Sequence, residues 1–160
     1  MKKQTLLFSL LLLILIFCFT IAGQAQNCDP ITQPRLKEIL VQLGYTVKDI
    51  TTTPGKEKYE ADISTTDFNV PIGFEISAST NYIWLTVFLG KAPADTSSDF
   101  YNNLLKQNFK IQPTFFYITD TGNLMLGLPV DNRGVNNTVM KRYIDFISGK
   151  VSETKSYWQN

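Results

Sequence analysis

The sequence predicts a single α+β domain in which an antiparallel sheet packs against helices. Several short segments alternate apolar with polar residues, which is the period of a half-buried strand. Other segments place apolar residues three and four positions apart, as amphipathic helices do. No repeat, linker or low-complexity stretch divides the chain after residue 25. The expected order of elements is therefore α-β-β-β-α-β-β-α.

Composition narrows the classes of function. Of the 160 residues, 44% are hydrophobic and 18% are charged, which is typical of a globular domain and not of a disordered tail. The sequence contains no histidine. This excludes histidine-based nucleophilic triads, histidine metal ligands and the usual proton shuttle near neutral pH. We therefore expect a protein that is not an enzyme.

The N-terminal residues predict export. Lys2 and Lys3 precede an apolar run at 10–19, and the small residues Gly23 and Ala25 suit a signal peptidase. The alternative, a retained membrane anchor, needs about 20 apolar residues and flanking stop signals. We expect residues 1–25 to be a cleaved signal peptide and residues 26–160 to form the exported domain, secreted or periplasmic.

Cleavage also decides the charge of the domain. Loss of the two N-terminal lysines turns 15 basic and 14 acidic residues into 13 and 14, a net charge of −1. No long run of either sign remains. We therefore expect no nucleic-acid partner and no membrane insertion after cleavage.

The two cysteines predict neither a lipid anchor nor an internal disulfide. Lipidation needs small residues before the cysteine, but Cys18 follows Phe17 and Cys28 follows Asn27. Cys18 leaves with the signal peptide, so Cys28 has no internal partner. A free thiol and an intermolecular bridge both remain open for Cys28.

The first helix is expected at about 33–43. Leu36, Ile39, Leu40 and Leu43 follow the helical period, and Gly44 follows the last of them. The stretch 45–56 is left unassigned, since its start reads as extended and its Thr-Thr-Thr-Pro-Gly segment reads as a loop.

Three alternating segments after residue 58 predict an antiparallel meander. The alternating apolar residues are Tyr59, Ala61 and Ile63, then Val70, Ile72, Phe74, Ile76 and Ala78, then Ile83, Leu85, Val87 and Leu89.

The second half of the chain adds two helices and a hairpin. A helix to about Asn108 is expected after a cap at Asp95, Ser97 or Ser98. Segments 115–118 and 124–126 flank Asp-Thr-Gly-Asn, which is typical of a tight hairpin turn. After Pro129 and a loop at 131–134, the apolar spacing from Val135 onward predicts a third helix ending near 157–158.

The order and spacing of these elements resemble those of the YbjN and type III secretion chaperone-like superfamily. The sequence segments that carry the resemblance lie at 36–45, 84–87, 104–109, 122–126 and 151–158, and the last of them contains Val151, Thr154 and Trp158. The resemblance implies a non-enzymatic fold whose members commonly dimerise. It also implies, for the chaperone branch, binding of extended client segments along the sheet and helix surface. Its secretion chaperones are cytosolic and acidic, so only the fold and a tendency to bind partners are carried over.

Candidate catalytic motifs have simpler interpretations. Asp120-Thr121-Gly122 is the tripeptide of aspartic proteases, but only 38 residues follow it and their pattern is helical, so we predict a turn. Asp95 and Asp99 are expected to cap a helix rather than to bind metal. Gly55-Lys56 lacks the rest of a phosphate-binding loop, and the sequon at 136–138 is treated as chance. We expect no metal and no cofactor.

The informative feature is the second face of the predicted sheet. One face is expected to meet the helices through Ile72, Phe74, Ile76, Ile83, Leu85, Val87, Phe116, Ile118, Leu124 and Leu126. The other then collects Tyr82, Trp84, Thr86, Phe88, Phe115, Tyr117 and Met125, where a solvated sheet would carry polar residues. Either a helix covers part of this face, or it binds a client or a second copy. The predicted binding residues are Tyr82, Trp84, Phe88, Phe115 and Tyr117.

The leading functional hypothesis is a secreted or periplasmic, non-enzymatic module of chaperone-like fold that binds a protein client or itself. Two alternatives from other classes stay open. One is a small hydrolase-type effector that uses carboxylates or the Asp120 turn. The other is a structural component of the cell envelope.

Overall fold

The computed structural model describes residues 29–66, 69–93 and 98–159. The predictions for the signal peptide, for Cys18 and Cys28 and for the Asp95 cap lie outside these residues. Within them the chain forms one α+β domain with an open, six-stranded antiparallel sheet. The predicted fold class is confirmed, and the order of its elements matches the prediction apart from an additional strand, β1 (Val47–Thr51), and a short final helix, α5 (Lys155–Trp158).

The sheet has the strand order β1-β2-β3-β4-β6-β5. Strands β2, β3 and β4 form the expected meander, and β5 pairs with β6 as the expected hairpin. Because β6 pairs with β4, it places the hairpin beside the meander. The strands are β1 (Val47–Thr51), β2 (Lys58–Ser64), β3 (Asn69–Ile76), β4 (Tyr82–Lys91), β5 (Phe115–Ile118) and β6 (Asn123–Asp131).

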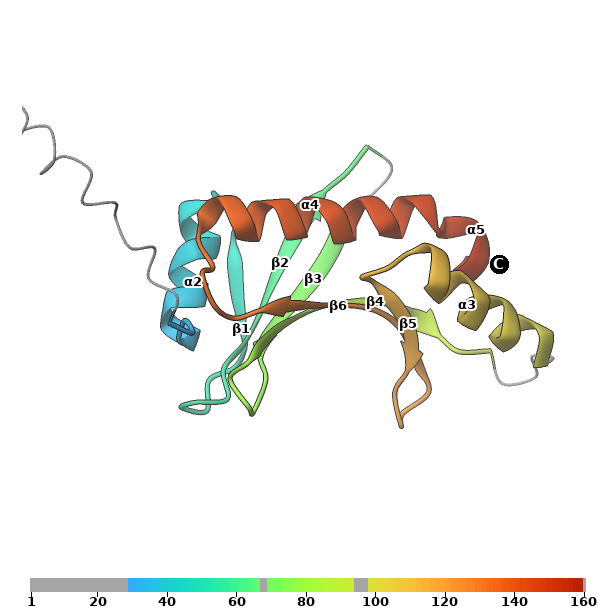
Figure 1. The fold of residues 1–160 in the computed structure, drawn as a ribbon, viewed down its shortest axis with the longest axis horizontal. Helices are drawn as coiled ribbons and strands as arrows, with labels where there is room; N and C mark the ends of the chain where they lie inside the picture. The colour runs from blue at the N-terminus through green and yellow to red at the C-terminus, as the bar shows by residue number, and fades with distance from the viewer. Residues whose placement is uncertain (1–28, 67–68, 94–97, 160) are drawn as a thin grey trace, which may run out of the picture.

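The helices lie on one side of the sheet and at its β5 end (Figure 1). They are α2 (Gln33–Gln42), α3 (Ser98–Lys110), α4 (Asn137–Glu153) and α5 (Lys155–Trp158). Helix α4 runs across the sheet, with α2 beside it, and α3 packs next to β5. The underside of the arched sheet in Figure 1 carries no helix of the described chain. None of the helices among the described residues is long and apolar enough to span a membrane.

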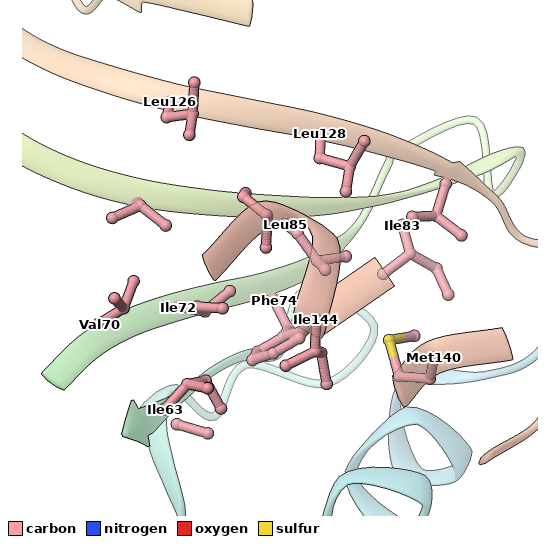
Figure 2. Packing of buried hydrophobic residues seen from close by; sticks show 14 of the residues in the cluster. Ile63, Val70, Ile72, Phe74, Ile83, Leu85, Leu126, Leu128, Met140 and Ile144 are labelled. Atoms are coloured by element: carbon pink, nitrogen blue, oxygen red, sulfur yellow. The ribbon is translucent and has the colours of Figure 1, made fainter. Parts of the chain in front are cut away.

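The core fills the space between the sheet and helices α2 and α4. Figure 2 shows Ile144 of α4 next to Phe74 of β3, with Leu85 of β4 close by. Leu36, Ile39 and Leu40 of α2 have no exposed surface, as their helical spacing predicts. Each strand in the middle of the sheet buries every second residue, for example β3 from Val70 to Ile76.

Three details differ from the sequence-based expectations. The unassigned stretch after residue 44 contains an additional strand, β1. Strand β6 continues through Pro129 to Asp131. Proline has no N–H to donate to a neighbouring strand, and it is tolerated here because β5 pairs with β6 only as far as Gly127. The final helical segment divides at Thr154 into α4 and the short α5.

Candidate functional site

The five predicted binding residues lie together on the face of the sheet that faces away from the helices. We call Tyr82, Trp84, Phe88, Phe115 and Tyr117 the aromatic shelf. Ring centroids lie 6.3 Å apart for Tyr82 and Trp84, 6.1 Å for Trp84 and Phe115, and 5.7 Å for Phe115 and Tyr117. Four rings therefore form a continuous row, and Phe88 ends the shelf opposite Met125 of β6.

Glycine makes this row possible. Trp84 is on β4 and Phe115 on β5, so their rings meet over the intervening strand β6. Gly127 of β6 pairs with Phe115, and a Cβ atom on it would lie 3.1 Å from the rings of both Phe115 and Tyr117. Because Gly127 has no side chain, the two rings lie low over the strand.

The shelf is partly exposed. Tyr82 and Phe88, at its two ends, are 46% and 52% exposed, while the three central rings are half-buried against one another. The open question from the sequence was whether a helix covers this face. Among residues 29–66, 69–93 and 98–159, only α3 comes near it, at the β5 end, where Tyr117 borders a pocket against that helix. No described helix lies over the rest of the shelf (Figure 1).

The other half of the open face, on β1 to β3, is charged. Lys48 of β1 pairs with Glu60 at 3.1 Å and with Asp62 at 3.2 Å, and Lys58 pairs with Glu75 at 2.7 Å. Glu75 is the strand partner of Trp84, so the boundary between the two halves falls between β3 and β4. A helix packed over this half of the sheet would remove these charged side chains from water, whereas an uncovered face leaves them solvated.

The polar atoms of the shelf can donate hydrogen bonds. No described residue accepts a hydrogen bond from the indole N–H of Trp84 or from the hydroxyls of Tyr82 and Tyr117. Burial raises the pKa of the Tyr117 hydroxyl, and the carboxylate of Glu75 raises it further. Tyr117 therefore stays protonated, and a donor, throughout the neutral range.

The candidate catalytic motifs have structural roles. Asp120, Thr121 and Gly122 form the turn between β5 and β6, where Gly122 has a φ of 75° and its N–H donates to the carbonyl of Thr119. The prediction of a hairpin turn is confirmed. Asp99 lies in the first turn of α3. No group of three potential metal ligands occurs among the described residues.

A second exposed apolar patch was not predicted from the sequence. Leu105 and Phe109 of α3 are 65% and 80% exposed, and Ile118 of β5 is 43% exposed. Ile118 was expected in the core, but it lies at the end of the edge strand, beside a cavity of about 190 Å³ under α3. The sequence does contain a signal for this patch. Leu105 and Phe109 are four residues apart, so they share one face of α3, and that face differs from the one that buries Leu104.

The free edge of β5 is occupied by a side chain. The amide Nδ2 of Asn108 donates to the carbonyl of Phe116 at 3.2 Å, and the N–H of Phe116 donates to Asn108 Oδ1 at 2.7 Å. The carboxamide thus pairs with the strand as another peptide group would. Such pairing limits strand addition at this edge.

No protein-family model matches the chain, and no curated protein matches it. A solved structure is similar: a chain of the heterodimeric complex ExoU–SpcU from the type III secretion system of Pseudomonas aeruginosa. The similarity covers 76% of this chain and 96% of that chain, with a TM-score of 0.54 and 16% sequence identity. The expected resemblance in fold is confirmed to this extent: the chain shares its fold with a chain of a type III secretion complex. At this identity the likeness shows the fold alone.

Proposed function

We propose that the chain is a non-enzymatic protein-binding module of type III secretion chaperone-like fold, and that it binds its partner through the aromatic shelf. The observation that carries the proposal is the row of rings from Tyr82 to Tyr117, which lies on a sheet face without a helix over it. A protein partner would remove this apolar row from water.

The chemistry of the shelf suits protein recognition. Tryptophan and tyrosine supply large contact areas at a low cost in side-chain entropy, and they are enriched among the residues that dominate binding energy. Exposed apolar patches rimmed by polar groups mark interaction sites on soluble proteins. Here the rim is the charged half of the same face, with Lys58 and Glu75 next to the shelf. The similar ExoU–SpcU chain also belongs to a protein complex, which supports a protein partner.

We also propose that the module works outside the cytoplasm, secreted or periplasmic. The support is the sequence of residues 1–25, with its two lysines, its apolar run and its small residues before the expected cleavage site. The intact mass of the exported protein tests this. A mass that begins near Gln26 is expected, whereas one that includes Met1 or an acyl chain would contradict it.

Site-specific photo-cross-linking in cells tests the binding surface. A photoreactive residue replaces Phe88, which is 52% exposed, and in a matched control it replaces Lys48, whose side chain is 53% exposed on the charged half. We expect a protein adduct from position 88 and none from position 48. Equal labelling at both positions, or no protein adduct at position 88, would overturn the proposal. An adduct with a second copy of the chain would identify the partner as itself.

A further inference from the structure

We propose that the aromatic shelf binds a proline-rich segment of a partner protein in the polyproline II conformation. This inference rests on the proposed function and adds the class of ligand. Proline-rich segments dock in grooves lined by aromatic residues, because the polyproline II helix is ordered before it binds.

The backbone under the shelf excludes strand addition. Strand β4 pairs with β3 and β6, and β6 pairs with β4 and β5. The outer edge of β5 is paired at Phe116 with the side chain of Asn108. A ligand on this face contacts side chains only. Only side-chain oxygens could accept hydrogen bonds from the amide N–H groups of an ordinary extended peptide there, with no regular ladder, whereas proline has no N–H to satisfy.

The donors of the shelf complement such a ligand. The indole N–H of Trp84 and the hydroxyls of Tyr82 and Tyr117 have no acceptor among the described residues. A polyproline II helix makes no internal hydrogen bonds, and its carbonyl groups point outward. Side-chain donors on the protein and carbonyl acceptors on the ligand therefore match.

The orientation of the rings also favours proline. The rings of Trp84 and Phe115 meet edge to face at 84°, and those of Phe115 and Tyr117 are tilted by 42°. Neighbouring rings set at these angles do not form one flat platform. A pyrrolidine ring is compact enough to pack on the face of a single aromatic ring, so successive prolines could contact successive rings of the row.

The charge beside the shelf indicates a basic residue in the ligand. On the open face of β1 to β3, the carboxylates of Glu60, Asp62 and Glu75 outnumber the two lysines that pair with them. Glu75 is the one next to Trp84. A ligand with an arginine or lysine beside its prolines would balance this charge at the boundary of the shelf.

Selection from a random peptide library displayed on phage tests the inference. The full exported chain is the bait, and the Trp84→Leu variant, which keeps an apolar side chain but removes the ring and the N–H, is the counter-selection. We expect the enriched peptides to share at least two prolines and one basic residue. Synthetic copies of them should bind Trp84→Leu at least about tenfold more weakly. Lys48→Ala, on the charged half, is the matched control and should not weaken binding.

Single donors should have smaller, separable effects. Tyr117→Phe keeps the ring and removes one hydrogen bond of about 1 kcal/mol, so the dissociation constant should rise about fivefold. Replacing the peptide prolines by alanine should abolish measurable binding. The fluorescence of Trp84, recorded in a Trp158→Phe background, reports binding at the shelf itself.

The outcomes separate this inference from the proposed function. A cross-linked protein partner at position 88 together with proline-poor enriched peptides would overturn the proline-rich ligand and leave the protein-binding module standing. Failure of both cross-linking and peptide selection would remove both proposals. Enrichment that is equal on the Trp84→Leu variant, or binding of a soluble cell-wall oligosaccharide at the shelf, would also overturn the inference.

Discussion

The two faces of one sheet are built on opposite chemistry. The face under α2 and α4 is aliphatic, and Ile72, Leu85 and Leu126 have no exposed surface there. The open face, one residue further along each strand, carries aromatic rings on β4 to β5 and ion pairs on β1 to β3. Leu85 and Trp84 are neighbours in the chain but belong to different faces. The comparison teaches that alternate residues of one strand can differ in role: one set forms the core, and the other remains on the surface, where we propose that it binds a partner.

The largest effect should come from the helix-covered face. Leu85→Ala removes a fully buried side chain from the centre of the core, so it should lower the free energy of unfolding by about 2–5 kcal/mol. Chemical denaturation of the variant and the parent protein measures the difference. Thr86→Ala, on the open face of the same strand, is the control and should change little. A loss below about 1 kcal/mol at Leu85 would contradict the division between the faces.

Gly127 offers a test of how the shelf is supported. A Cβ atom at this position would lie 3.1 Å from the rings of Phe115 and Tyr117, which must then move. Gly127→Ala should cost about 1–3 kcal/mol, as overpacking does, and should change the near-ultraviolet circular dichroism of the aromatic rings. Gly149→Ala is the control, since nothing lies within 4 Å of the position a Cβ would take there. An unchanged aromatic spectrum in Gly127→Ala would show that the rings do not lie over the strand.

Trp84→Ala should affect binding more than stability. The indole is half-buried on the open face and packs on other shelf residues, so we expect a loss of about 1–2 kcal/mol and a chain that stays folded. Cross-linking from position 88 should disappear in the same variant. A loss of stability as large as that of Leu85→Ala would place Trp84 in the core and refute the comparison.

Much of this fold could be predicted because apolar and polar residues alternate regularly along its central strands. Strands β2, β3 and β4 bury every second residue between two neighbours, so period 2 is strong in the sequence. Strand β1 lies at the edge, and its three middle residues are exposed, which removes that period. The edge position also explains why the prediction of Ile118 in the core was wrong. Ile118 is at the end of edge strand β5, where even a residue on the inner face is exposed.

The site could be predicted in composition but not in arrangement. Period 2 places Trp84 on one face of β4 and both Phe115 and Tyr117 on one face of β5. The alternation within each strand does not show that β6, which follows β5 in the chain, lies between β4 and β5 in the sheet. The contact between Trp84 and Phe115 depends on that strand order and on Gly127, whose missing side chain was not recognised as part of the site.

The charged half of the open face should contribute little to stability. Lys58 and Glu75 are 46% and 42% exposed, so removing their pair with Lys58→Met should cost at most about 1 kcal/mol. The same change leaves the Glu75 carboxylate without its lysine, next to Trp84. Binding of a basic, proline-rich peptide should therefore become tighter and more sensitive to salt. Weaker binding in Lys58→Met would contradict the assignment of Glu75 to the ligand's basic residue.

The smallest effect should appear in alkaline solution. Burial raises the pKa of Tyr117 above its ordinary value of 10.0, so the folded chain holds this proton more tightly than the unfolded chain does. The stabilisation is complete below pH 10 and is lost as the pH rises through the higher pKa of the folded state. The melting temperature should therefore fall above pH 10, and less steeply in Tyr117→Phe, which has no proton to lose. The other tyrosines whose pKa is raised by burial, Tyr45 and Tyr59, remain in that variant, so part of the slope should persist.

If Tyr117→Phe and the parent protein show the same slope, the Tyr117 hydroxyl loses its proton as readily in the folded chain as in the unfolded one. It would then be an ordinary exposed phenol and not a donor held at the edge of a half-buried shelf.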